Sequence, residues 1–553
     1  MHALARDVAY AQLPRTSLAV RHVAAAAWLE SKARGRVEDL ADVIAYHYAT
    51  ALELARAAAQ TEQAAELEAP ALRFLSLAGD RALGLDTAGA LANFERALAL
   101  APPGHPGRPE ALARFGEAAL QAGRFAQAAE ALEEAIASFR ARGDFAAATR
   151  AMATLGSVLG ALGDPRRSEL PEEALALLEP LPPGPELVGA LTQVAITETL
   201  SGRSEAAVGY AERALALAEE LGLDRSARAL GFRGLARANL GDPGGLEDMR
   251  EAIALATDAG QGRDAALLHN NLGLALFGFE GPGAALEVQR AGIAFAQARG
   301  LTEMVDGITA DTLDTLLDIG DLDQALDVAA DIAERLESEN VVDLSMARAQ
   351  QARILALRGQ TAQAAGSLDR LESRSRGAGD PEVVVIGLGS SALARAGLGQ
   401  DDAAAALLAE VEATPGARDF PTYANYLPTM VRTALATGER ELAERLVAGV
   451  EPSNPSVEHA LLAANAALAE AHGDLQAASE AYAEAADRWV QFGVVPEQAF
   501  ALLGQGRCLV GLGRASEAGP PLTAACEIFA RLRTKPALTE TEALLQEASA
   551  QAG

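Results

Sequence analysis

The chain has 553 residues, half of them apolar but only 4% aromatic, and its formal net charge is −30. A surface this acidic repels phosphate backbones, so the composition argues against direct nucleic-acid binding. No run of alternating β-branched and polar residues is bounded by turn residues, which argues against a β class and predicts an all-α protein.

The composition also bears on where the protein resides. The cysteines, Cys508 and Cys526, are interpreted as small apolar residues in a reducing compartment. No apolar run reaches the ~18 residues of a membrane span, and the N-terminus lacks the apolar core of a signal peptide. Lysine is almost absent beside many arginines, with Lys32 and Lys535 as its two occurrences, which is typical of a GC-rich bacterial genome. We therefore expect a bacterial, cytoplasmic protein that does not contact a membrane.

Residues 1–68 do not follow the pattern of the rest, and we expect a separate helical segment there. Its stretches are HALARDVAYAQLPR from His2, HVAAAAWLE from His22 and DVIAYHYATALELA from Asp42. They resemble the winged-helix and linker region that precedes the tetratricopeptide array in bacterial STAND-class ATPases fused to nucleotide-cyclase or LuxR-type modules. The resemblance covers residues 2 to about 58 and implies an upstream ATPase or effector module, with this chain as the C-terminal portion of a larger regulator. The alternative is a standalone protein whose first helices form an N-terminal cap.

From residue 69 to residue 533 the sequence repeats. Twelve glycines, each between two apolar helical stretches, lie 39 or 40 residues apart except for one interval of 35. A fixed period of this size is typical of a solenoid, in which each helix pair buries its apolar face against its neighbours. The turn glycines are Gly84, Gly123, Gly163, Gly202, Gly241, Gly281, Gly320, Gly359, Gly399, Gly438, Gly473 and Gly513.

The clearest repeat runs from Glu110 to Arg142. Its first helix carries the small residue Gly116 and ends at Gly123, because glycine accepts the left-handed backbone beyond a helix. Its second helix carries a large residue at Leu132 and a small one at Ala135, a pattern that permits close helix crossing. This order resembles the tetratricopeptide repeat and implies a right-handed α-solenoid of about 12 helix pairs.

Two repeats are irregular, and a different segment ends the array. The repeat at Gly438 is short, and an insertion from Pro165 to Pro171 follows Gly163. Each is either a neutral irregularity or the mark of a kink or a loop at a binding face. Residues 534–553, opened by Pro536, are predicted to form a capping helix, because solenoid ends need a polar outer face.

The stretch VVVIGLGSSA from Val383 resembles a strand that enters a dinucleotide-binding turn. However, it occupies the position of a first helix, with Gly399 on the period of the repeat, and no βαβ unit surrounds it. We interpret it as a helix.

No other motif indicates chemistry. The chain has no Gly-Lys pair for a phosphate-binding loop, no serine in a GxSxG elbow and no histidines at metal-ligand spacing. His2, His22 and His47 could converge, where a packing role is favoured over metal binding. We expect no enzyme activity, no catalytic residue, no cofactor and no metal site.

The remaining candidates are polar residues on the first helix of each pair, which lines the concave face in tetratricopeptide arrays. The positions that face inward in that family select Arg228, Asn239, Asn270, Asn271, Asp314, Arg353 and Arg432 as a ligand groove, with Arg150, Thr192, His269, Asp318, Arg507, Glu117 and Gln121 as further members. Adjacent asparagines can hold a peptide backbone through paired donors and acceptors, and arginines can pair with an acidic group. For each residue the alternative is a solvated helix face or an ion pair within the array.

These observations favour a non-catalytic scaffold that binds a protein, a peptide or a small ligand in a concave groove. The resemblance of the N-terminal segment makes it the sensor arm of a bacterial ATPase signalling or transcription regulator. The alternative is a standalone tetratricopeptide adaptor that assembles protein partners.

Overall fold

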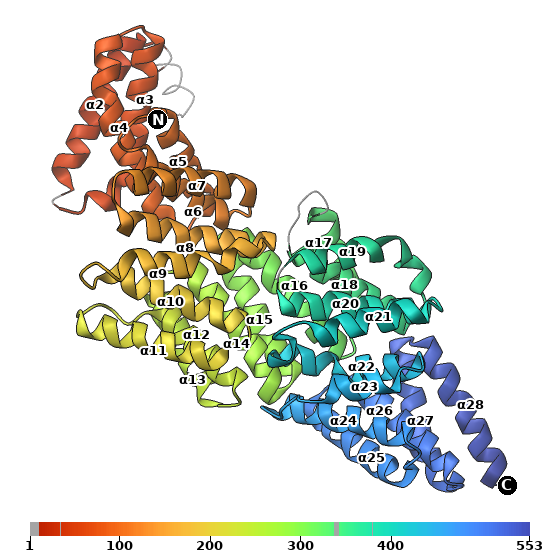
Figure 1. Cartoon of the computed structure of the whole chain (residues 1–553). Helices are drawn as coiled ribbons and strands as arrows, with labels where there is room; N and C mark the ends of the chain where they lie inside the picture. The colour runs from red at the N-terminus through yellow and green to blue at the C-terminus, as the bar shows by residue number, and fades with distance from the viewer. Residues whose placement is uncertain (1–9, 11, 34, 337–341, 379, 553) are drawn as a thin grey trace. The chain divides into compact units, whose positions relative to one another are not determined.

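The structure, a computed structural model, describes residues 10, 12–33, 35–336, 342–378 and 380–552 (Figure 1). This part of the chain forms 27 α-helices and four short 3-10 helices, and it contains no strand. The predicted all-α class is confirmed. Most of the first predicted motif, including His2, lies outside the described residues.

The N-terminal segment consists of α2 (Arg15–Lys32), a 3-10 helix (Val37–Leu40) and α3 (Ala41–Ala57). Its apolar core continues into the following helix, where the rings of Tyr48 and Phe74 stack at 5.5 Å between centroids. The segment is therefore packed onto the beginning of the array.

Twelve helix pairs follow, and each contains one of the predicted turn glycines between its two helices. All twelve glycines have a positive φ, from 66° to 89°, which residues with a Cβ atom avoid. The predicted array of tetratricopeptide-like helix pairs is confirmed. The pairs are α4 (Thr61–Ala82) with α5 (Thr87–Leu100), α6 (Arg108–Gln121) with α7 (Phe125–Ala141), α8 (Phe145–Leu162) with α9 (Leu170–Leu178), α10 (Pro185–Leu200) with α11 (Ser204–Glu220), α12 (Ala227–Asn239) with α13 (Gly244–Asp258), α14 (Gly262–Glu280) with α15 (Pro282–Gln297), α16 (Thr302–Asp318) with α17 (Leu322–Leu336), α18 (Val342–Leu357) with α19 (Ala365–Gly377), α20 (Pro381–Gly397) with α21 (Asp401–Ala413), α22 (Pro421–Ala436) with α23 (Arg440–Val447), α24 (Pro455–Ala471) with α25 (Leu475–Phe492), and α26 (Val495–Gly511) with α27 (Ala515–Leu532).

Within a pair, a second glycine allows the two helices to cross closely. A Cβ atom on Gly116 would lie 2.5 Å from Cγ of Leu132, and one on Gly506 would lie 2.4 Å from the Leu522 side chain. Both leucines are fully buried. The small and large residues that alternate in the sequence therefore form the contact between the two helices of one repeat.

A further series of glycines with positive φ lies between the repeats, and it was not predicted. Gly143, Gly222, Gly260, Gly300 and Gly493 each follow the second helix of a pair. These glycines end the second helices as the predicted series ends the first ones, since both positions require a left-handed backbone.

The stretch from Val383 lies in helix α20, as predicted. The insertion after Gly163 contains a 3-10 helix, Pro165–Ser168, that leads into α9. The short repeat at Gly438 has a second helix, α23, of only 8 residues.

Helix α8 corrects one expectation from the sequence. Among the described residues it is the one helix that is long and apolar enough to cross a membrane by length and composition. Arg150 interrupts its apolar run, so the sequence alone did not indicate a helix of this kind. Of its residues, 44% are buried, and Met152 and Leu159 lie in the protein interior.

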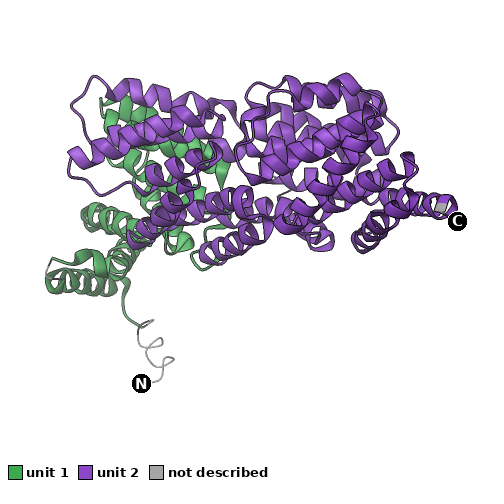
Figure 2. Ribbon diagram, turned by 90° about the horizontal axis from the view of Figure 1, so that it is seen from below, with its two compact units in different colours: residues 1–158, 297–303 green, residues 159–296, 304–553 purple. Residues whose placement is uncertain are grey.

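The helices form two compact units (Figure 2). Unit 1 comprises Met1–Val158 and Gln297–Glu303, and unit 2 comprises Leu159–Ala296 and Met304–Gly553. The last helix, α28 (Lys535–Ala552), packs on α26 and α27. The domain limits expected at residues 68 and 533 stay a prediction.

Unit 2 contains contacts between repeats that are far apart in the sequence. Arg167 Nη2 donates to Asp380 Oδ2 at 2.8 Å across 213 residues. A Cβ atom on Gly241 would lie 2.1 Å from the carbonyl oxygen of Ser453, and helix α14 contacts α24. The chain of unit 2 thus returns to its own earlier repeats, which brings first helices of distant pairs together.

Candidate functional site

Polar side chains from the first helices of five consecutive pairs meet within unit 2. The helices are α14, α16, α18, α20 and α22. We call this group the interior cluster, and its members are Asn270, Asp311, Asp314, Asp318, Gln350, Arg353, Glu382, Thr422 and Tyr426.

Asp314 accepts three hydrogen bonds within the interior cluster. Its Oδ1 accepts from Gln350 Nε2 at 2.7 Å, from Arg353 Nη1 at 3.1 Å and from the Tyr426 hydroxyl at 3.2 Å. Burial raises the pKa of Asp314, although Arg353 opposes this shift. These bonds join helices α16, α18 and α22.

Arg353 is the one cation among the nine members of the interior cluster. It is 4% exposed, and its guanidinium carbon lies 4.4 Å from the centre of the Tyr426 ring. Burial would lower the pKa of Arg353, but the neighbouring Tyr426, Asp318 and Asp314 outweigh burial and raise it. Arg353 is therefore held as a cation inside the protein.

Three carboxylates of the interior cluster form no ion pair with any described residue. Asp311 accepts from Asn270 Nδ2 at 2.6 Å, and Glu382 accepts from the Thr422 hydroxyl. Asp318 is 7% exposed, and its side chain forms no hydrogen bond with another described residue. Burial is the main reason that the pKa rises to about 6 for Asp311, about 7 for Asp318 and about 7 for Glu382.

The two asparagines predicted for the groove are both buried. Asn270 directs its amino group to Asp311, because a carboxylate can only accept, and its Oδ1 has no hydrogen-bond partner among the described residues. The same is true of Asn271 Nδ2 and of Oε1 in the fully buried Gln350. Such unpartnered polar atoms are uncommon in protein interiors and require an explanation.

Arg432, another predicted groove residue, pairs with a different repeat. Its Nη1 and Nη2 donate to the two carboxylate oxygens of Glu497 on α26, each at 2.6 Å. Its guanidinium carbon lies 4.1 Å from the centre of the Phe500 ring. This bidentate pair adjoins the interior cluster, because the charge of Glu497 contributes to the raised pKa of Asp318.

The last two predicted groove residues lie on α12, which supplies no member of the interior cluster. Arg228 Nε lies 3.5 Å from Asp264 Oδ1, and Asn239 is the half-buried last residue of the helix. The structure thus groups Asn270, Asp314 and Arg353 directly, and it places Arg228 and Asn239 in an earlier repeat.

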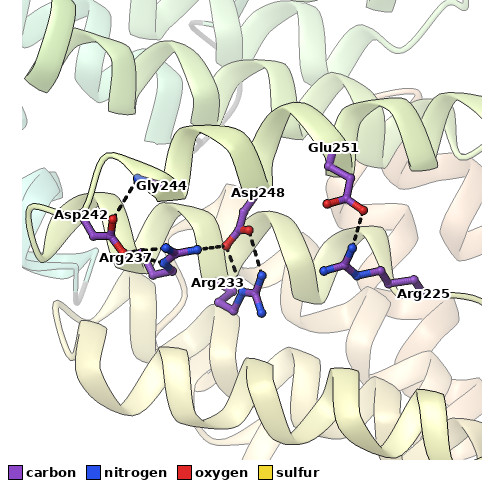
Figure 3. Close-up of polar contacts among 7 residues, drawn as sticks. All are labelled: Arg225, Arg233, Arg237, Asp242, Gly244, Asp248 and Glu251. Atoms are coloured by element: carbon purple, nitrogen blue, oxygen red, sulfur yellow. Dashed lines mark hydrogen bonds and ion pairs between the residues drawn. The ribbon is translucent and has the colours of Figure 1, made fainter.

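An arginine clamp joins α12 to α13 in that earlier repeat (Figure 3). Arg233 donates to both oxygens of Asp248, at 2.9 and 2.8 Å, and Arg237 Nη1 donates to Asp248 Oδ2 at 2.8 Å. Arg237 also donates to Asp242, whose second oxygen accepts from the Gly244 amide. Burial favours a higher pKa for Asp248, but the hydrogen bonds from the two arginines outweigh it, and the net shift is downward. The clamp therefore holds the two helices of this repeat together.

The further candidates from the sequence mostly contact their own or a neighbouring helix. Thr192 donates to the Val188 carbonyl at 2.8 Å, Gln121 accepts from the Gly84 amide at 3.3 Å, Glu117 pairs with Arg114 at 3.0 Å, Arg507 donates to Glu470 at 2.9 Å, His269 lies 5.9 Å from the Phe295 ring, and Arg150 is exposed.

Several members of the interior cluster were not predicted from the sequence. Asp311 and Gln350 each stand nine residues before a turn glycine, at 320 and 359, and this position was not among those projected from the tetratricopeptide family. Asp311 and Gln350 lie one helical turn from Asp314 and Arg353, so the spacing of three was the available signal. Tyr426 and Glu382 had no comparable signal.

The N-terminal segment contains a histidine pair. His22 Nδ1 and His47 Nδ1 lie 2.8 Å apart, and the Tyr10 hydroxyl lies 2.6 Å from His22 Nε2. Burial lowers the pKa of both histidines, and the charge of His47 lowers that of His22 further. His22 and His47 therefore converge. Among the described residues, no group of His, Cys, Asp and Glu is arranged to hold a metal ion.

Comparison with known proteins adds little. No protein family matches this chain, and no curated protein matches it. The APC/C hetero-tetramer Cut9–Hcn1 is similar with 15% identity and a TM-score of 0.39, over 84% of this chain and 92% of that chain. Yeast Tom70 is similar with 13% identity and a TM-score of 0.31, over 79% of this chain and 95% of that chain. Similarity this distant transfers neither a partner nor a function.

Proposed function

We propose that this chain is a non-catalytic scaffold that binds a protein, peptide or small ligand through the inner faces of its first helices. The interior cluster supports this proposal most strongly. A cluster that served stability alone would pair its charges, since an uncompensated buried carboxylate is destabilising. Local rules are broken in this way chiefly at functional sites.

We further propose that the chain acts in the cytoplasm as the sensor arm of an ATPase signalling regulator. The N-terminal segment supports this through its resemblance to the linker of STAND-class ATPases, and both cysteines are free thiols. A standalone adaptor remains the second candidate. Immunoprecipitation of the native protein separates the two. Mass spectrometry of the precipitated polypeptide is the measurement. A phosphate-binding Gly-Lys-Ser/Thr sequence in the same polypeptide supports the sensor arm, whereas a polypeptide of 57.1 kDa that lacks this sequence supports the adaptor.

Affinity capture from the native cytosol tests the scaffold itself. The bait is the purified chain, compared with an interior variant that combines Asn270→Ala and Asn271→Ala. An exterior variant that combines Gln324→Ala and Gln476→Ala removes two exposed amides from α17 and α25 as a matched control. Loss of a partner from the interior variant alone supports the proposal. A partner that both variants retain would place binding elsewhere on the array.

A further inference from the structure

We propose that the interior cluster binds a linear aliphatic polyamine. The inference rests on the proposed ligand-binding function and specifies the chemistry of the ligand. The ligand carries several ammonium groups, separated by short apolar spacers, and enters as a polycation.

The interior cluster has an excess of hydrogen-bond acceptors. Asp311, Asp318 and Glu382 form no ion pair among the described residues, and the one cation of the cluster, Arg353, is bonded to Asp314. The amides add to this excess. Asn270 Oδ1 and Gln350 Oε1 are buried without a donor, and the amino groups of both residues already face carboxylates. One donor of the cluster, Arg353 Nε, is buried without an acceptor, so acceptors remain in excess. An ammonium group supplies what is missing, since it brings three donors, a positive charge and no acceptor.

The acceptors form a row. Asp311, Asp314 and Asp318 stand at intervals of three and four residues on one face of α16, with rises of about 4.5 and 6 Å along the helix axis. Glu382 on α20 lies near this row, because it accepts from Thr422 on α22, one helical turn from Tyr426, which donates to Asp314. A metal ion requires ligands that converge on one point, and no such group exists among the described residues. A flexible chain with separated positive charges matches a row of carboxylates.

The site is reachable, and the charge of the protein favours such a ligand. The Asp314 side chain is 28% exposed, and Asp311 and Glu382 are half-buried, so solvent reaches the row. The net charge of −30 raises the local concentration of polycations around the protein. The setting is largely buried, with Asp318 7% exposed, which favours a free polyamine over lysine side chains carried by a folded partner.

The test is calorimetric titration of the full chain with spermidine at constant ionic strength. The interior variant combines Asp318→Asn and Glu382→Gln. The exterior control combines Asp327→Asn and Glu334→Gln, which make the same charge change at exposed positions of α17. The interior variant is expected to fold, because it removes two largely buried charges that form no ion pair. Circular dichroism checks this.

We expect saturable spermidine binding to the unchanged protein and to the exterior control, and binding at least tenfold weaker to the interior variant. Equal binding by both variants would overturn the inference, as would the absence of saturation. Binding of a lysine-rich peptide without binding of spermidine would overturn it too. A protein partner captured through Asn270 and Asn271 without any spermidine binding leaves the scaffold proposal standing and refutes this inference alone.

Discussion

Replacement of Gly241 by alanine tests the contact between distant repeats of unit 2. Gly241 has φ +87°, and a Cβ atom there would lie 2.1 Å from the carbonyl oxygen of Ser453. Gly473 is the matched control, because it has φ +86° with nothing within 4 Å of the added Cβ atom. The two substitutions therefore share the conformational penalty and differ in the steric one.

The two penalties can be estimated separately. A left-handed backbone costs an alanine about 1–2 kcal/mol, so Gly473→Ala should lower the local stability by that amount. Gly241→Ala must in addition displace the backbone at Ser453, since the 2.1 Å separation lies far inside van der Waals contact. Overpacking of this kind costs about 1–3 kcal/mol more.

Hydrogen exchange measured by mass spectrometry is the appropriate assay, because a long array unfolds repeat by repeat and has no single unfolding free energy. In Gly241→Ala we expect faster exchange both in α12 and α13 and in the segment around Ser453. In Gly473→Ala we expect faster exchange only next to the substitution. If Gly241→Ala leaves exchange around Ser453 unchanged, the return of the chain onto its earlier repeats is refuted.

Three further predictions concern charged groups. Asp248→Asn removes the shared partner of the half-buried Arg233 and Arg237 and should lower the local stability of α12 and α13 by about 2 kcal/mol, whereas unchanged hydrogen exchange in both helices would contradict the clamp. The pKa of Asp318 is raised to about 7, so the native state binds the proton more tightly, and stability should fall as pH rises from about 4 through 7. Melting temperatures at pH 5 and pH 8 should differ less in Asp318→Asn. The pKa values of His22 and His47 are lowered, so their contribution is present above about pH 6.5 and is lost as pH falls through the folded values. The protection of α2 and α3 from hydrogen exchange, taken relative to the intrinsic exchange rate at each pH, should therefore fall on acidification in the unchanged protein and fall less in His47→Gln.

The helix pairs could be predicted from the sequence because their determinants are local. A glycine such as Gly123 ends a helix through its own backbone, and Gly116 admits Leu132 from the other helix of the same pair. The period repeats these local rules along the chain. Contacts between the two helices of one pair can therefore be predicted from the sequence.

The interior cluster could be predicted only in part, since its geometry depends on residues far apart in the chain. Asp314 and Arg353 were identified by their positions on the first helices. The hydroxyl of Tyr426, however, donates to Asp314, which is 112 residues away in the sequence, and no spacing in the sequence predicts that contact. Nor did spacing reveal that the arginine would be bonded to an aspartate of the protein, leaving Asp318 and Glu382 unpaired.

The distance between these partners also gives the interior cluster a role that a local site would lack. In a solenoid each repeat contacts mainly its neighbours, so repeats far apart open and close independently unless something joins them. The carboxylates of Asp311, Asp314 and Glu382 come from two helices. The charge of Asp314 raises the pKa of Asp311, and both charges raise the pKa of Glu382, which means that these groups repel when charged. A bound polycation would cancel this repulsion only while the helices stay together. The polycation must then bind the array more tightly when these helices are close together than when they are apart. A ligand shifts the population of two conformations only through such a difference in affinity. A sensor arm built on this principle would report its ligand through the spacing of its repeats.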